Sequence, residues 1–357
     1  MYTPFGLYWN GMWQKSASGK SIPVISPVTE EVLGEAPAAN KSDTRKVVES
    51  AVSGTAQWRK VIALERSRML RRVAEVMRER TDEMARWLSL ELGKPLDQSK
   101  GEVSMAIEQF EWYAEEAKRI YGHILESRQP HGKVLIQHEP IGVVAAFTSW
   151  NFPVVLAARK IAPALAAGCS VILLPAEEAP GSAMSLVQCL HEAGVPAGVI
   201  NLINGSADTI SPVLLNESRV RKISLTGSAR VGKLLIKASA ETLKRTSMEL
   251  GGHAPVIIYA DADAEAIAEQ AALVKFKHCG QVCASPSRYF IHESQAEAFT
   301  NKFIEIAQNF KLGNGMESGV DIGPLATKKR LKEVELMVSG TLKSGARLRL
   351  GGKRPER

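Results

Sequence analysis

The pattern of apolar and polar positions changes its period about a third of the way along the chain. Up to residue 37, short alternating runs between Gly, Ser and Pro predict strands and turns. Apolar residues then recur at helical spacing, and we expect helices over 43–58, 64–92 and 97–120. Asp43 is the expected cap of the first helix, and Gly93 is the expected stop of the second.

From residue 134 onward, short apolar runs alternate with helical stretches. Strands are predicted over 134–138, 142–147, 170–174, 199–203, 222–225, 255–258, 288–291 and 347–350. Helices are predicted between them over 154–166, 181–193, 208–215, 264–278 and 296–309. Such alternation predicts an α/β protein with a doubly wound parallel sheet. The glycine pair Gly251-Gly252 is expected to start a second α/β unit.

The composition and charge of the chain exclude several classes of protein. The 357 residues are 45% hydrophobic and carry a net charge of +7, but basic residues interleave with acidic ones along 66–80 and form no stripe. We therefore expect neither a nucleic-acid nor a membrane partner. The N-terminus lacks a secretory signal and no apolar run is long enough to cross a bilayer, so a cytoplasmic protein is expected.

The four cysteines are too few and too widely spaced to predict a disulfide framework. Cys169 and Cys189 lie in apolar context and are expected to be small buried side chains. Cys279 follows His278, but no second pair of ligands accompanies them, so no metal site is predicted.

Two short segments carry the chemistry of a covalent catalyst. Glu249 stands before the turn Leu250-Gly251-Gly252, and Cys283 ends the small, polar run Gly280-Gln281-Val282. A thiolate assisted by a carboxylate base can attack a carbonyl carbon. Either residue alone would be ambiguous, because a lone cysteine is more often packed than reactive.

A third segment, Ser149-Trp150-Asn151-Phe152-Pro153, lies between a predicted strand and a predicted helix. It can be an aromatic turn with Pro153 at the first helical position. It can also hold the amide of Asn151 rigidly enough to donate a hydrogen bond to a developing oxyanion.

A fourth segment could receive a phosphate. The glycine fingerprint of dinucleotide-binding folds is absent, and 226–234 nearly forms a phosphate-cradling loop but ends in Leu234 where that loop needs a hydroxyl for Mg²⁺. Nucleotide hydrolysis is therefore the weaker alternative. Gly227 and Ser228 open a helix after a strand, and a helix N-terminus suits a pyrophosphate.

Taken together, the four segments resemble the NAD(P)-dependent aldehyde dehydrogenase superfamily, and the likeness extends over nearly the whole chain. The resemblance implies an aldehyde dehydrogenase-like α/β fold with an NAD-binding domain, a small β extension for oligomerisation and a second, incomplete α/β catalytic domain. These parts are expected at 1–120 with 142–250, at 121–141 and at 251–357, respectively.

The resemblance also implies roles for individual residues. Cys283 would be the nucleophile, Glu249 the general base, and Asn151 with the Cys283 backbone N–H the oxyanion donors. The residues expected to hold the cofactor are Ser149, Trp150, Glu177, Gly227, Ser228, Val231 and Leu250. An adduct carrying an oxyanion is a good hydride donor, so the expected product is a thioester that water then hydrolyses.

Within the superfamily the chain is similar to succinate-semialdehyde dehydrogenases. The run 110–122 resembles theirs, and Arg159 and Arg288 match the arginines that bind their substrate's carboxylate. Two guanidinium groups would suit an aldehyde with a distant carboxylate, such as succinate semialdehyde. The alternative for both arginines is ordinary surface pairing.

Two departures from the superfamily pattern affect these expectations. Leu174 stands where a lysine usually holds the adenosine ribose, whereas Glu177 can accept from ribose hydroxyls and would repel a 2′-phosphate, so NAD is favoured and NADP is possible. The sequence also ends at Arg357, whereas superfamily members continue and form homo-oligomers. The alternative function is therefore an inactive NAD-binding or structural remnant.

Overall fold

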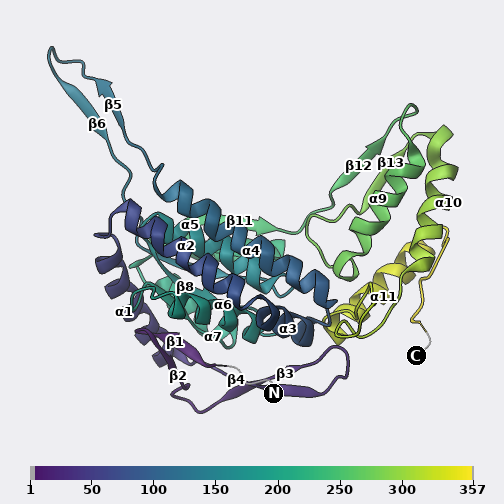
Figure 1. The fold of residues 1–357 in the computed structure, drawn as a ribbon, viewed down its shortest axis with the longest axis horizontal. Coiled ribbons are helices and arrows are strands. Elements are labelled where there is room, and N and C mark those ends of the chain that lie inside the picture. The colour runs from purple at the N-terminus through teal and green to yellow at the C-terminus, as the bar shows by residue number, and fades with distance from the viewer. Residues whose placement is uncertain (1–4, 356–357) are drawn as a thin grey trace. The chain divides into compact units, whose positions relative to one another are not determined.

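The computed structural model describes residues 5–355, which divide into two compact units (Figure 1). The first unit contains residues 5–24, 33–87 and 100–250. The second contains 25–32, 88–99 and 251–355. Short segments of the N-terminal third thus belong to the second unit, although they are distant from it in sequence.

The first unit is built on a seven-stranded sheet with the order β11-β10-β7-β8-β9-β1-β2. Its strands are β1 (Leu7–Trp9), β2 (Met12–Gln14), β7 (Val143–Phe147), β8 (Ser170–Leu174), β9 (Ile200–Leu202), β10 (Val220–Gly227) and β11 (Arg245–Leu250). The five strands from β7 to β11 run parallel, while β1 pairs antiparallel with both β9 and β2. The predicted doubly wound parallel sheet is confirmed.

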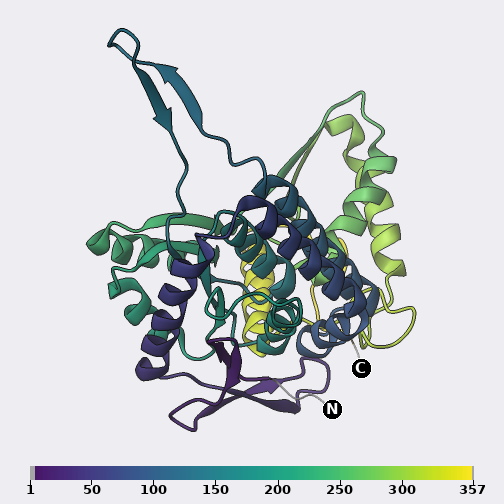
Figure 2. The same cartoon turned by 60° about the vertical axis from the view of Figure 1, so that its left-hand side comes forward.

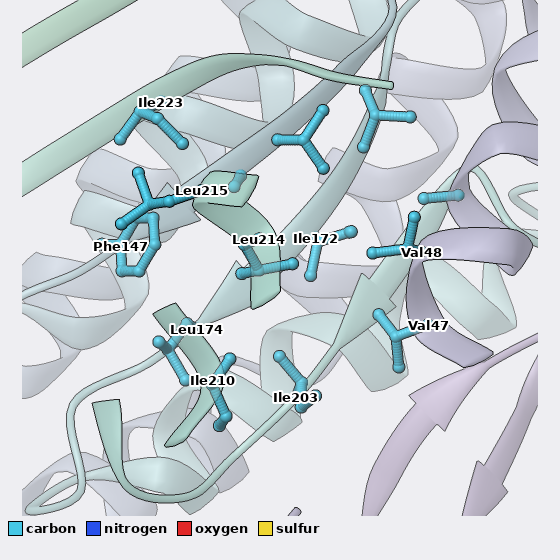
Figure 3. Close-up of a cluster of buried hydrophobic side chains, with 14 of the residues drawn as sticks. Val47, Val48, Phe147, Ile172, Leu174, Ile203, Ile210, Leu214, Leu215 and Ile223 are labelled. Atoms are coloured by element: carbon cyan, nitrogen blue, oxygen red, sulfur yellow. The ribbon is translucent and has the colours of Figure 1, made fainter. Parts of the chain in front are cut away.

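The central strands are apolar because both of their faces are covered. Every residue of β7 and β8 is buried, as expected for parallel strands between two layers of helices. On one face, Ile172, Leu174 and Phe147 pack against Leu214 of the helix after β9 (Figure 3). This packing fixes the strands whose carboxyl ends carry the candidate site.

The helices connect the strands in the order predicted. They are α1 (Lys41–Trp58), α2 (Ala63–Glu79), α3 (Thr81–Leu92), α4 (Leu96–Ala117), α5 (Pro153–Ala166), α6 (Pro180–Glu192), α7 (Ala207–Asn216) and α8 (Ala229–Ser239), followed by the 3₁₀ turn Ala240–Thr242. Two details of the prediction are wrong. Asn40, not Asp43, caps α1, and the single helix expected over 64–92 is broken at Arg80 into α2 and α3.

Two smaller sheets accompany the large one. Strands β3 (Ser21–Ile25) and β4 (Val32–Pro37) form a pair, and β5 (His123–Glu126) and β6 (Lys133–Ile136) form an antiparallel hairpin. The hairpin extends away from the helices of its unit in both views (Figures 1 and 2). All eight of its strand residues are exposed.

The second unit contains the parallel pair β12 (Pro255–Ile258) and β13 (Arg288–Ile291). Helices α9 (Ala264–Phe276) and α10 (Glu293–Asn309) pack on this pair, and the 3₁₀ turn Lys277–Gly280 follows α9. The strand predicted at 347–350 is wrong. The chain there is irregular, because it follows directly on α11 (Lys328–Lys343) and finds no strand to pair with among the described residues.

None of the helices in the described part of the chain is long and apolar enough to span a bilayer.

Candidate active site

The Cys283 thiol lies on an exposed loop between α9 and β13, and it forms no disulfide. The buried side chain of Gln281, which is 7% exposed, holds this loop in place. Its side-chain amide donates to the carbonyl of His278 at 3.2 Å, and its oxygen accepts from the backbone N–H of Ala326 at 3.1 Å. A buried amide with both ends bonded fixes the backbone around it, so Cys283 is presented on a rigid support.

The approach to this loop has an uncommon backbone. His278, Cys279 and Gly280 have φ angles of 49°, 56° and 71°, three successive residues in the left-handed region. Such angles are easy for glycine and costly for other residues. The backbone N–H of His278 donates to the side chain of Gln98 at 2.9 Å, which helps to hold the segment. The predicted loop around Cys283 is therefore ordered and locally strained.

Asn151 lies between β7 and α5 in the first unit, and it is 9% exposed. Pro153 begins α5, as the sequence predicts. The N–H groups of Val154 and Val155, which a helix start leaves unpaired, donate to a carboxylate oxygen of Glu102 at 2.9 and 3.3 Å. The Glu102 carboxylate is fully buried. Glu102 thus anchors the helix start next to the Asn151 amide.

Glu249 is exposed and lies near the end of β11, paired in register with Thr226 of β10. Lys160 of α5, which is 7% exposed, is close enough to interact with its charge. Burial lowers the pKa of Lys160 to about 8, while the Glu249 carboxylate opposes this shift and the Lys222 cation adds to it. The Lys160 ammonium donates to the Ser224 hydroxyl at 3.1 Å.

Lys160, like Glu102, is a residue of this region that the sequence interpretation missed. It follows Arg159 on a predicted helix, where a lysine is ordinarily a solvated side chain. The sequence marks Lys160 only indirectly. Helix α5 is apolar on nearly every side, and a charged residue that is buried on such a helix needs a polar partner.

The residues expected to hold a cofactor surround the carboxyl ends of β7, β8 and β10 in the first unit. Ser149 and Trp150 follow β7, Glu177 is exposed in the turn after β8, and Gly227 ends β10. Parallel sheets bind ligands at this edge. These four residues therefore lie at the end of the sheet where a ligand is expected.

Ser228 caps α8, with its hydroxyl accepting from the N–H of Val231 at 3.3 Å. Arg230 and Lys233 are exposed in the first turns of the same helix and add positive charge to its N-terminus. The Leu250 side chain packs closely against α8 at Gly232. A Cβ atom on Gly232 would lie 2.8 Å from a Leu250 methyl group. A small residue at 232 is thus needed for helix and strand to approach.

This edge also contains a buried polar atom without a partner. The Thr148 hydroxyl has no hydrogen-bond partner among the described residues, although the side chain is only 8% exposed. The backbone N–H of Thr148 donates to Leu174 at the end of β8. An unpaired buried hydroxyl, a positive helix N-terminus and an exposed carboxylate together fit a dinucleotide with its pyrophosphate and ribose hydroxyls.

The two arginines expected at a substrate carboxylate lie in different units. Arg159 is exposed on α5 and forms no ion pair within residues 5–355. Arg288 is the first residue of β13 and lies 6.0 Å from the centre of the Phe290 ring. Both guanidinium groups are accessible to an anion.

The sheet places this chain among the doubly wound α/β proteins. A model of the aldehyde dehydrogenase family matches residues 13–357. The chain is 41% identical over 346 residues to glutarate-semialdehyde dehydrogenase of Pseudomonas putida, covering 97% of this chain and 72% of that protein. It therefore belongs to the aldehyde dehydrogenase family.

Two further relatives support this assignment. The succinate-semialdehyde dehydrogenase [NADP(+)] of Escherichia coli is 40% identical over 348 residues, with 98% of this chain and 72% of that protein covered. The crystal structure of a succinate-semialdehyde dehydrogenase from Burkholderia pseudomallei matches with a TM-score of 0.96 and 40% identity, covering 98% of this chain and 73% of that one. The predicted family and fold are confirmed.

Proposed function

We propose that this chain oxidises an aldehyde with an anionic group at its far end, such as succinate semialdehyde or a similar semialdehyde acid, to the carboxylic acid. The observation that carries the proposal is the exposed, rigidly supported Cys283 in a chain of this family. The names of the relatives, which are dehydrogenases of glutarate and succinate semialdehydes, support the substrate class. No observation favours the inactive remnant.

In the proposed reaction, the Cys283 thiolate attacks the aldehyde carbon and forms a hemithioacetal. The Asn151 side-chain amide and the Cys283 backbone N–H donate to its oxyanion. A bound nicotinamide dinucleotide supplies the hydride acceptor. The carbon becomes a thioester, and Glu249 removes a proton from the water that hydrolyses it. The charge of Glu249 acts on the buried Lys160 ammonium of α5 and opposes the lowering of its pKa.

The test is reduction of NAD⁺ followed at its near-ultraviolet absorbance with succinate semialdehyde as substrate. Cys283→Ala should lower kcat/KM by at least about a thousandfold, because no other group on the chain replaces the nucleophile. Cys279→Ala is the matched control, since it removes the other thiol of the same segment. Equal rates for the parent and Cys283→Ala would reject the proposal.

Arg159 and Arg288 are proposed to bind the substrate's carboxylate. Arg159→Met and Arg288→Met should each raise KM for succinate semialdehyde by roughly tenfold, the effect of one charged hydrogen bond. Butyraldehyde, which has the same carbon count and no carboxylate, is the control substrate. An equal effect on both aldehydes would mean that the arginines act on the fold and not on the carboxylate.

The cofactor is proposed to be NAD in preference to NADP. Leu174 is buried in the core and offers no charge to a 2′-phosphate, while Glu177 is exposed at the same strand end and would repel one. The Escherichia coli relative is named for NADP, so the two proteins are expected to differ. Fluorescence titration should give tighter binding of NAD⁺, and tighter binding of NADP⁺ would contradict this assignment.

A further inference from the structure

The segment 148–152 joins β7 to α5 and carries Asn151. At its strand end, the backbone N–H of Thr148 donates to the carbonyl of Leu174 at 3.2 Å, which ties the segment to β8. The residues around Asn151 form a turn and a bend and belong to neither element. The direction of the Asn151 side chain therefore depends on what holds the helix end of the segment.

The start of α5 has no capping side chain of its own. Phe152 stands at the N-cap position, where a serine, threonine, aspartate or asparagine usually accepts from the helix, and its side chain makes no such bond. Pro153, the first helical residue, has no N–H to satisfy. The N–H of Leu156 donates to the carbonyl of Phe152 at 3.0 Å. The buried N–H groups of Val154 and Val155 therefore need an acceptor from elsewhere.

Glu102 supplies this acceptor from a different helix. It lies on α4, is fully buried, and one of its carboxylate oxygens accepts from Val154 and Val155 at 2.9 and 3.3 Å. These are the second and third residues of α5, whose N–H groups an N-cap side chain ordinarily satisfies. Glu102 thus performs the task of an N-cap although it belongs to α4, and it fixes where α5 begins.

This attachment bears on Asn151, which lies two residues before the start of α5. An oxyanion donor has to be held at hydrogen-bond distance from the atom where charge develops. A displacement of about 1 Å can lower a rate roughly a hundredfold. Without the Glu102 acceptor, two buried N–H groups would lack a partner, which favours a shift of the helix start or the entry of water.

We propose that Glu102 is a positioning residue for the proposed reaction. By anchoring the start of α5, it holds the Asn151 side-chain amide where that amide donates to the oxyanion. The inference rests on the proposed function for the role of Asn151. The anchoring itself involves residues of the first unit alone, so it can also be measured without turnover.

The kinetic experiment is a double-mutant cycle of Glu102→Leu and Asn151→Ala, with succinate semialdehyde and NAD⁺. Glu102→Leu should lower kcat at least about tenfold and leave KM nearly unchanged, because an oxyanion donor acts in the transition state. In the Asn151→Ala background it should lower kcat no further, since the donor that it positions is already absent. An equal loss of kcat in both backgrounds would overturn the inference.

Two milder variants guard against a Glu102→Leu protein that does not fold. Glu102→Gln keeps a side-chain oxygen that can accept from both N–H groups, and it should restore most of kcat. Glu102→Asp draws the carboxylate back by one methylene and should lower kcat severalfold, again only when Asn151 is present. Circular dichroism of each variant checks the fold.

Asp43→Ala is the matched control. Asp43 is also a fully buried carboxylate that accepts from a backbone N–H at the start of a helix, but that helix is α1. The control should lower stability and leave kcat unchanged. A loss of kcat as large as that of Glu102→Leu would mean that Glu102 acts on the fold in general, and the inference would be overturned.

A nuclear magnetic resonance measurement separates this inference from the proposed function. In protein labelled at asparagine with the observable nitrogen isotope, the side-chain signals of Asn151 are identified by their loss in Asn151→Ala. Glu102→Leu and Glu102→Asp should shift or broaden them, whereas Asp43→Ala should not. Unchanged signals in both Glu102 variants overturn the inference. Signals that respond in a parent without turnover would reject the proposed function and support the anchoring by Glu102.

Discussion

Lys160 shows how one buried residue can link the fold to the proposed chemistry. Its ammonium is held by the Ser224 hydroxyl and interacts with the charges of Glu249 and Lys222. The pKa near 8 means that the folded protein loses this proton more readily than the unfolded chain, whose lysine has a pKa of 10.5. A buried group of this kind makes stability depend on pH.

We expect stability to rise with pH because of Lys160. Between about pH 8 and 10.5 the unfolded state binds more protons than the folded state, so the free energy of unfolding increases through this window, by about 3 kcal/mol in all. Lys160→Met should remove this part of the slope. Urea unfolding of parent and variant at several pH values from 7 to 10.5 measures it.

Lys237→Met is the control for that measurement, because Lys237 is exposed on α8. It should leave the slope of the parent unchanged. Identical slopes for the parent and Lys160→Met would show that Lys160 does not change its protonation differently in the folded state.

At the scale of elements, the start of α1 shows how a motif joins two parts of the chain. The Asn40 side chain accepts from the N–H groups of Ser42 and Asp43 at 2.7 and 3.0 Å, and the Asp43 carboxylate accepts from Asn40 in return. The fully buried Asp43 carboxylate also accepts from Ser16 and from the N–H of Ala17. Asp43 thus fixes the preceding loop to the helix.

Asn40→Ala should destabilise the first unit by about 1 kcal/mol, the usual effect of removing an N-cap. Asp43→Ala should cost more, about 2–3 kcal/mol, because it removes the shared acceptor of the part-buried donors of Ser16, Ala17 and Asn40. Chemical unfolding followed by tryptophan fluorescence reports both, since Trp58 is buried at the end of α1. Asn40→Asp keeps an acceptor and should be close to the parent. A larger effect for Asn40→Ala than for Asp43→Ala would contradict this ranking.

The helices and strands could be predicted well from the sequence, because the spacing of apolar residues follows which side chains the fold buries. Boundaries were harder to predict, because they depend on single side chains. Asp43 is a good capping residue, but Asn40 takes that place and leaves Asp43 to the third position. The residues at 347–350 alternate like a strand, yet a strand needs a neighbour, and a local pattern does not contain one.

The residues of the candidate site differ in how clearly the sequence marks them. Cys283 and Asn151 stand out in the sequence because they lie in short segments between regular elements, and Glu249 because it precedes a glycine pair; their roles stay predictions. Lys160 and Glu102 do not, because their importance comes from burial beside α5 and from the partners they meet there. Residues that act through a tertiary environment leave little trace in a local pattern.

At the scale of the whole molecule, the β5–β6 hairpin exposes apolar side chains on both of its strands. Ile124 and Leu135 face each other across the hairpin and are 70% and 62% exposed. A two-stranded ribbon is at best marginally stable by itself in water. We propose that the hairpin pairs with another copy of the chain, in agreement with the oligomerisation role expected from the sequence.

Replacing both residues, as Ile124→Glu with Leu135→Glu, should shift the chain toward the monomer in light scattering. The substitution places like charges directly opposite each other and removes the apolar contact. Val32→Glu is the control, since Val32 is an exposed apolar residue of β4. An unchanged molar mass for the hairpin variant would reject the role of the hairpin in assembly.

The three residues with left-handed backbone angles before Cys283 affect how the stability of this protein could be raised. His278 and Cys279 each hold a backbone conformation that disfavours a side chain by roughly 1–2 kcal/mol. Glycine or asparagine at either position would relieve that cost. Selection for heat resistance would therefore favour changes four or five residues from the proposed nucleophile. In this segment, a substitution that makes the protein more resistant to heat would also change the backbone that leads to the proposed nucleophile.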